Sequence, residues 1–236
     1  MASAEHRPRR RGLALLLVIV VLAVLVVVAD RVAQQVAEGR VAKQLQTQLG
    51  TATAPQVDIA GFPFLTQLSH RSFSSVRVVG DDVRPPGSST TIKHLDMRLG
   101  DVTSDDNFRT STAQRVAGTA TLDYPTVKKL SGQALTYAPP DRVAVSSPTT
   151  LMGLPVTARV VGRPAVDIAR QTLTLAQPQL SVAGVQVPES TAQALLSSVA
   201  KPAPLRGVPF GLKVTGVTAQ QDGLAAGLTG GPVTFS

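Results

Sequence analysis

The longest apolar stretch of the chain runs from Leu13 to Ala29 and contains only Leu, Val, Ile and Ala. A helix rises about 1.5 Å per residue, so these residues would cover roughly 25 Å, just short of a bilayer's hydrocarbon core. Basic flanks stay on the cytoplasmic side. The pattern predicts a cytoplasmic basic flank over 1–12, a transmembrane helix over 13–29 and an exported domain over 30–236. Four arginines form the flank: Arg7, Arg9, Arg10 and Arg11.

A cleaved signal peptide has a similar pattern, and it is the alternative to a retained anchor. Val27, Val28 and Ala29 offer small residues at a possible cleavage site. The apolar run is longer than most signal cores, and a helical pattern continues beyond it, so a retained anchor is favoured. A lipoprotein signal is excluded because the chain has no cysteine to acylate.

The segment 30–49 has the spacing of a helix that leaves the membrane. Its apolar positions form one broad stripe, and Gly50 is suited to end the helix. We expect the stripe to pack on the protein's own domain. A dimerising coiled coil is the alternative, but it needs more heptads than this stripe provides. The stripe consists of Val32, Val36, Val41, Leu45 and Leu49.

Short segments rich in Val and Thr, with partial alternation of apolar and polar residues, predict strands along the rest of the chain. Pro, Gly, Asp and Ser mark loops over 51–55, 81–89 and 100–110. The strands are expected over 56–59, 72–79, 91–102, 113–122, 142–146, 150–161, 171–175, 180–187, 212–219 and 224–229.

Two helices are predicted between these strands. The first covers 124–130, with Asp123 at its start and Pro125 in its first turn. The second covers 188–200, where Pro188 opens it and Pro202 ends it. Its apolar residues follow the spacing i, i+3, i+4, i+7 of one helix face: Ala192, Leu195, Leu196 and Val199. Many strands with few helices indicate the α+β class.

The segment Gly61-Phe62-Pro63-Phe64-Leu65 concentrates two of the six phenylalanines. Gly61 is suited to a positive φ, and Pro63 favours an extended residue before it. The two phenylalanines either fill the core at a turn or line an apolar cavity, and the sequence leaves both readings open.

Composition changes the picture in two ways. With no Cys and no Trp, and with only two Tyr, the core must be built mainly from aliphatic residues and without disulfides. The net charge is +8, but removing the flank leaves 19 of 23 basic and 14 of 15 acidic side chains. No dense basic run with stacking aromatics remains, so no nucleic-acid partner is expected.

The search for catalytic and metal-binding patterns fails. No nucleophile elbow, phosphate-binding loop, dinucleotide fingerprint or H-E-x-x-H motif is present. His70 and His94 occupy polar segments without a paired nucleophile. Asp101, Asp105 and Asp106 lack the spacing and the distal Glu of a calcium loop, which favours a turn. We therefore expect no enzyme activity, no metal and no cofactor.

The order of these elements resembles the LmeA-like phospholipid-binding family of actinobacterial cell envelopes. The shared elements are the anchor, the helix after it, the strand followed by Gly61 to Leu65, the late helix, and Pro209-Phe210-Gly211. The resemblance implies a fold similar to tubular lipid-binding proteins, in which a curved, mainly antiparallel sheet wraps one or two long helices. It also implies a role in envelope lipid or lipoglycan (mannan) biosynthesis, and it offers no catalytic residue.

We therefore predict a single-pass, extracytoplasmic (periplasmic) protein whose partners are phospholipid and the membrane. The site is expected where the late helix meets the Gly61 to Leu65 segment, and a solid core made of the same residues is the alternative. A second hypothesis is a non-enzymatic partner that stabilises an envelope glycosyltransferase, with lipid binding incidental. The predicted lipid-binding residues are Phe62, Phe64, Leu65, Leu195, Leu196, Val199 and Phe210.

Overall fold

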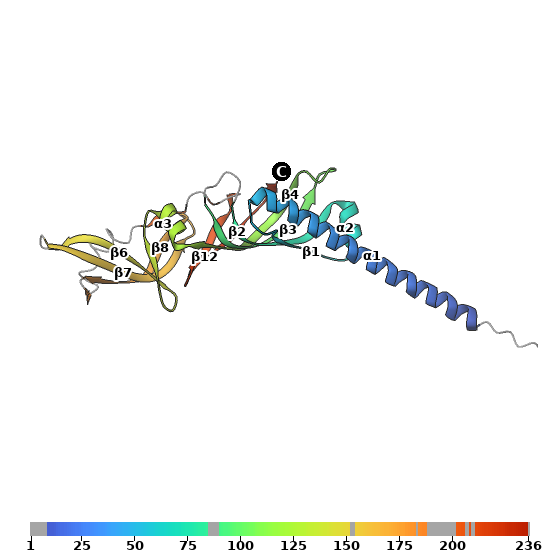
Figure 1. The fold of residues 1–236 in the computed structure, drawn as a ribbon, viewed down its shortest axis with the longest axis horizontal. Helices are drawn as coiled ribbons and strands as arrows, with labels where there is room; N and C mark the ends of the chain where they lie inside the picture. The colour runs from blue at the N-terminus through green and yellow to red at the C-terminus, as the bar shows by residue number, and fades with distance from the viewer. Residues whose placement is uncertain are drawn as a thin grey trace, which may run out of the picture.

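The computed structural model describes residues 9–84, 90–151, 154–182, 184–187, 202–205, 208 and 211–235. The molecule is elongated: one long helix projects from one end, and two antiparallel sheets follow each other along the long axis (Figure 1). The helix predicted over 188–200 lies outside the described residues, and so does Phe210.

Helix α1 (Arg9–Leu49) joins the predicted transmembrane segment and the predicted helix 30–49 into one unbroken element of 41 residues, about 60 Å long. The large apolar side chains from Leu15 to Val28 are 42–64% exposed, so this part does not pack on the domain. It is long and apolar enough to cross a membrane, a property that signal sequences near an N-terminus share. Gly50, with φ of 57°, ends the helix as the sequence predicts.

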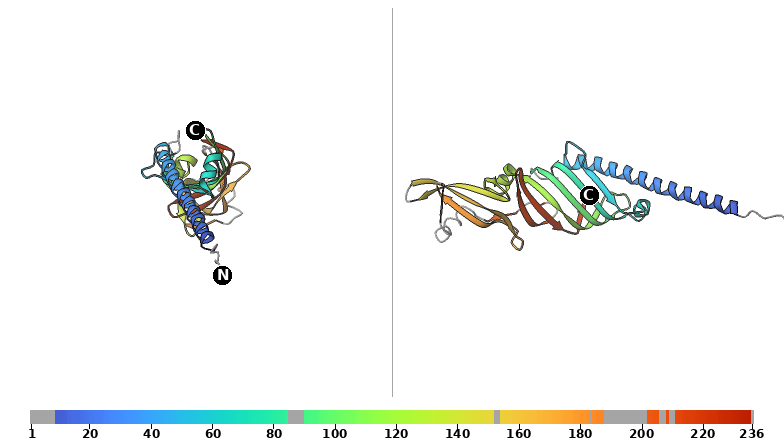
Figure 2. Two further views of the ribbon diagram at one scale, coloured as in Figure 1. Left: turned by 90° about the vertical axis from the view of Figure 1, so that its right-hand side faces the viewer. Right: turned by 90° about the horizontal axis from the view of Figure 1, so that it is seen from below.

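The second half of α1 packs on its own domain, as expected, but only Leu45 and Leu49 of the predicted stripe face the sheet. Val32, Val36 and Val41 are 54%, 49% and 37% exposed, because the smaller side chains of Ala33, Ala37 and Ala42 allow the closer approach on the packed face. Its small and aliphatic residues contact the core of the first sheet. Its polar residues bind the edge strand β1 (Gln56–Ala60): the Gln34 amide donates to the carbonyl of Ile59 at 2.8 Å, and the Ile59 N–H donates to Glu38 at 2.9 Å. Figure 2 shows the first sheet, twisted and curved, alongside this half of the helix.

The first sheet has seven strands in the order β1-β2-β3-β4-β12-β11, with β13 also paired to β4. Every neighbouring pair is antiparallel. The last strands of the chain therefore complete a sheet that the first strands begin. The remaining bounds are β2 (Ser72–Val83), β3 (Ile92–Ser104), β4 (Ser111–Asp123), β11 (Lys213–Gln220), β12 (Gly223–Gly230) and β13 (Val233–Phe235).

The second sheet has six strands in the order β10-β8-β7-β6-β5, with β9 paired to β8, and it is also antiparallel. The chain enters it from β4 and returns from it to β11. Its strands are β5 (Leu135–Ala138), β6 (Arg142–Leu151), β7 (Leu154–Asp167), β8 (Thr172–Val182), β9 (Val185–Gln186) and β10 (Ala203–Pro204).

Two short helices complete the described fold, α2 (Phe64–His70) and α3 (Tyr124–Ser131). The predicted helix 124–130 is confirmed: Asp123 accepts a hydrogen bond from the Thr126 N–H at 2.9 Å and caps it. Helix α2 was not predicted. The carboxylate that caps it belongs to Asp30, which is far away in sequence.

The α+β class with mainly antiparallel, curved sheets is confirmed, but the short strands β5, β10 and β13 were not predicted and several strand bounds differ. Strand β2 continues through Asp81 and Asp82, where a loop was expected, because these residues pair across to His94 and Lys93 of β3. Strand β3 likewise continues to Ser104. Strand β8 is one strand where two were expected. A bulge opposite Gly162 lets its hydrogen-bonded pairing with β7 continue past Pro178.

Candidate functional site

A cavity lies where the two sheets meet. Its volume is about 160 Å³, and about 1240 Å³ of space lies between its walls when the open mouth is included. Both sheets, the end of α1 and helix α3 contribute to the wall. The first sheet supplies Val83, Ile92, Leu95, Met97, Ala120, Leu122, Val214, Val217, Leu224, Ala226 and Leu228. The rest of the wall is Leu49, Thr90, Val127, Leu130, Ser131, Leu173, Ala203, Pro204, Leu205, Val208 and Leu212.

The wall is aliphatic almost throughout. Thr90 and Ser131 are its two polar side chains among the described residues, and the Ser131 hydroxyl is occupied by a hydrogen bond of 2.8 Å to the carbonyl of Val127. The described wall holds no charged group and no aromatic ring. Such a surface cannot activate a nucleophile or orient a polar substrate, but it suits a flexible apolar chain.

Local sequence explains how β11 and β12 form one part of the wall. Side chains alternate across a strand, so Leu224, Ala226 and Leu228 of β12 share the face toward the cavity. On β11 the register shifts between Val214 and Gly216. This bulge turns both Val214 and Val217 inward, although they are three residues apart.

Helix α3 supplies another part of the wall. Val127 and Leu130 line the cavity, while Lys128 and Lys129 are exposed. Hydrogen bonds from Thr126 hold the pKa of Asp123 below its usual value, so the cap is ionised at neutral pH. The cap fixes the start of α3, and the Tyr124 hydroxyl ties the helix to β11 by donating to the Gln220 carbonyl at 2.7 Å.

A polar clamp joins the two sheets beside the cavity. Gln171, in the turn between β7 and β8, has a φ of 50°. Its side chain accepts from the Val214 N–H at 2.8 Å and donates to the Val214 carbonyl at 3.1 Å. Its backbone carbonyl accepts from the Leu205 N–H at 2.9 Å. Val214 and Leu205 both line the cavity, so the clamp fixes the distance between two of its walls.

The structure places the sequence-predicted residues elsewhere. Phe64 is 1% exposed and stacks on Phe73 with ring centroids 6.3 Å apart, whereas Phe62 and Leu65 are 58% and 43% exposed. None of the three belongs to the described wall. The other four lie outside the described residues: Leu195, Leu196, Val199 and Phe210. The role of all seven in lipid binding stays a prediction. The signal that sequence reasoning did not use is the apolar alternation of β12.

The polar groups singled out in the sequence are paired at the surface. His94 lies 2.7 Å from Asp81, and both are exposed. Asp101 pairs with Arg115 at 2.7 Å, Asp106 pairs with Arg71, and Asp105 accepts from the Arg109 N–H at 2.7 Å. Within the ranges that the structure describes, no group of three or more His, Cys, Asp or Glu side chains is placed to hold a metal ion.

A family model described as LmeA-like phospholipid-binding matches residues 28–229, which is most of the chain and includes every described residue of the cavity wall. Searches of curated proteins and of solved structures returned no match.

Proposed function

Because the chain belongs to the LmeA-like phospholipid-binding family, we propose that the cavity between the two sheets binds the acyl chains of a phospholipid. The observation that carries this proposal is the aliphatic wall contributed by both sheets and by α3. Each buried methylene contributes roughly 0.8 kcal/mol, so a chain of about sixteen carbons offers on the order of 10 kcal/mol before the costs of ordering. Burial of acyl carbons is thus the main favourable contribution that this wall offers to a bound lipid.

The proposal extends to location and role. The uncharged half of α1 would cross the cytoplasmic membrane, with the arginine flank inside and both sheets on the extracytoplasmic side. There the protein would support envelope lipid or lipoglycan (mannan) biosynthesis by holding a phospholipid. A reporter that is active only outside the cytoplasm, fused after Ser236, should be active. Activity of a cytoplasm-specific reporter at the same position would contradict this arrangement.

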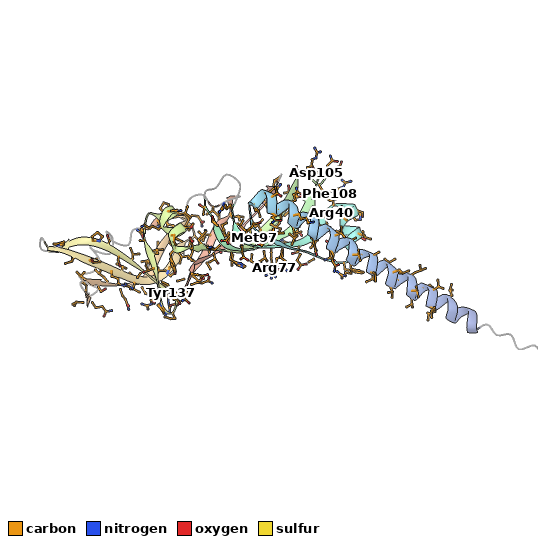
Figure 3. All side chains as sticks on the ribbon, viewed as in Figure 1. Arg40, Arg77, Met97, Asp105, Phe108 and Tyr137 are labelled. Carbon is orange, nitrogen blue, oxygen red and sulfur yellow. The ribbon has the colours of Figure 1, made fainter. Side chains whose placement is uncertain are left out.

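The binding site is tested by photo-crosslinking in detergent with the full-length protein. The probe is a phosphatidylinositol that carries a diazirine near the end of one acyl chain. We expect crosslinks on the exposed apolar part of α1, residues 15–28, where any lipid can contact the anchor, and also in peptides that contain Met97 or Leu224. Met97 lies in the middle of the molecule, well away from the anchor (Figure 3).

Two neighbouring alanines give a matched pair of variants. Ala226 faces the cavity, and Ala225 on the same strand is not part of its wall. Ala226→Phe should fill the cavity and remove the crosslinks at Met97 and Leu224, while it leaves those on α1. Ala225→Phe should leave both sets. If the wild-type protein crosslinks only on residues 15–28 of α1, the cavity is not the lipid site.

A further inference from the structure

Helix α2 is attached to α1 at the residue where the apolar run ends. Asp30 directly follows Ala29 and is 1% exposed. Its carboxylate accepts hydrogen bonds from the N–H groups of Phe64 at 3.0 Å and Leu65 at 2.8 Å. These are the first two residues of α2. The position of α2 along the axis of α1 is therefore fixed by the same residue that marks the end of the apolar run.

Apolar side chains at this attachment point outward. Phe62 is 58% exposed and Leu65 is 43% exposed, while Phe64 between them is buried. Their exposed fractions fall in the same range as those of the large apolar residues of α1 from Leu15 to Val28. An exposed aromatic and an exposed Leu beside each other are costly in water, so a partner that covers them is expected.

A cation lies against the exposed ring. The guanidinium carbon of Arg31 is 5.4 Å from the centroid of the Phe62 ring, and the same guanidinium donates to Gln34 at 2.8 Å. Arginine and aromatic rings are both favoured at the level of the lipid head groups, where the ring contacts acyl carbons and the cation contacts phosphate.

The length of the anchor sets the depth of this group. Ala29 is the last residue of the uncharged run, and Asp30 and Arg31 are the first charges after it. Burying these charges in hydrocarbon is unfavourable, so the head-group region coincides with them. Phe62 contacts Arg31 and Leu65 contacts Asp30, so both lie at that level.

We infer that Phe62 and Leu65 insert into the head-group region of the bilayer that α1 crosses and form a second membrane contact. This inference rests on the proposed membrane anchor. A single helix allows the domain to tilt and to rotate about the helix axis, and a second contact beside the helix removes that freedom. The cavity begins at Leu49, nineteen residues beyond Asp30 and so about 28 Å along the helix. The contact would thus hold the cavity at a fixed height and direction above the membrane.

The absence of Trp from the sequence makes a clean fluorescence test possible. The full-length Phe62→Trp variant is reconstituted into phosphatidylcholine vesicles whose acyl chains carry bromine, a quencher, either near the head group or near the terminal methyl. We expect Phe62→Trp to lose most of its fluorescence with bromine near the head group and much less with bromine near the methyl. Val185→Trp serves as the control. Val185 is 70% exposed, lies in β9 of the second sheet and is not part of the described cavity wall.

The outcomes separate this inference from the proposed anchor. If the protein floats with the vesicles but Phe62→Trp is quenched no more than Val185→Trp, the second contact does not exist and the anchor remains. If the protein does not float with vesicles, the anchor itself is wrong and the inference falls with it. Preferential quenching of Phe62→Trp by the shallow bromine supports both.

A second probe guards against a misfolded tryptophan variant. The chain has no cysteine, so Phe62→Cys and Val185→Cys each introduce a single thiol. A bulky, membrane-impermeant maleimide should label Phe62→Cys slowly in vesicles and rapidly in detergent, whereas it should label Val185→Cys equally in both. Equal labelling of Phe62→Cys in vesicles and detergent would overturn the inference.

Discussion

The interior of the first sheet is filled at one end and contains a cavity at the other. At the end beside α2 the interior is filled by stacked Phe64 and Phe73, and Asp30 binds the backbone of α2. At the junction with the second sheet the residues are aliphatic and enclose a cavity. Large planar rings fill space in one place, and small branched side chains leave it open in the other. In this chain, which is poor in aromatic residues, two of the six phenylalanines stack at the end of the sheet where α1 and α2 attach.

The side-chain hydrogen bonds also differ between the two ends of the first sheet. At the end beside α2, side chains of α1 bind β1 and α2 directly. At the junction, the Gln171 side chain binds the backbone of Val214 in β11, and the Tyr124 hydroxyl of α3 donates to the Gln220 carbonyl of β11 at 2.7 Å. The described wall of the cavity is therefore held by polar contacts between elements that lie far apart in the chain.

The largest expected effect separates two neighbouring phenylalanines. Phe64→Ala should lower the free energy of unfolding by about 3–5 kcal/mol, because it removes a buried ring that stacks on another. Phe62→Ala should cost less than about 1 kcal/mol in detergent, because that ring is exposed. Urea titration followed by circular dichroism measures both. Equal losses of unfolding free energy for the two variants would contradict a buried Phe64 beside an exposed Phe62.

A second pair compares a packed leucine with one at the cavity. Leu180 is 2% exposed and lies outside the described wall, and Leu224 is 4% exposed and lines the cavity. Leu→Ala changes in cores cost about 2–5 kcal/mol, with the larger values where a new hole is left. We expect Leu180→Ala near the upper value and Leu224→Ala near the lower, because the space beside Leu224 is already open. The same urea titrations give the difference, and the reverse order would show that the junction is packed.

Short-range patterns in the sequence predicted much of this fold. The uncharged run over 13–29, the end of α1 at Gly50 and the cap at Asp123 each involve residues close together in the chain. Propensity and periodicity act over such distances, so these elements could be read directly.

The rest depends on contacts between residues far apart in the chain. Helix α2 begins where it does because of Asp30, 34 residues before Phe64. The cavity could not be predicted from the sequence for a different reason. Alternation along β12 shows which face is buried, but it does not show whether the opposite wall fills the space. The two phenylalanines of the Gly61 to Leu65 segment were left open between core and cavity, and the structure places Phe64 in the core and Phe62 at the surface.

A glycine pair tests how rigid the backbone is at the end of the first sheet beside α2. Gly61 has a φ of 117°, and a side chain there would collide with the amide of Gln67. Gly61→Ala should therefore cost about 1–3 kcal/mol through backbone strain alone. Gly39, in α1, has no neighbour near the place of an added side chain, so Gly39→Ala should stabilise by up to about 1 kcal/mol. Thermal unfolding in detergent measures both, and a harmless Gly61→Ala would indicate a loop that adjusts freely.

The smallest expected effect concerns the cap of α3 at the cavity. Asp123→Ala should cost about 1 kcal/mol, while Asp123→Asn should cost little, because Asn caps a helix equally well. Hydrogen bonds from Thr126 lower the pKa of Asp123, so folding favours its ionised form. Its contribution to stability is complete at neutral pH and is lost as the pH falls through the lowered pKa. The stability difference between wild type and Asp123→Ala should therefore shrink on acidification to about pH 3, whereas the difference between Asp123→Asn and Asp123→Ala should stay constant. Urea titrations of the three proteins at several pH values provide the measurement, and a difference between wild type and Asp123→Ala that does not change with pH would mean that the carboxylate's charge does not hold this wall of the cavity.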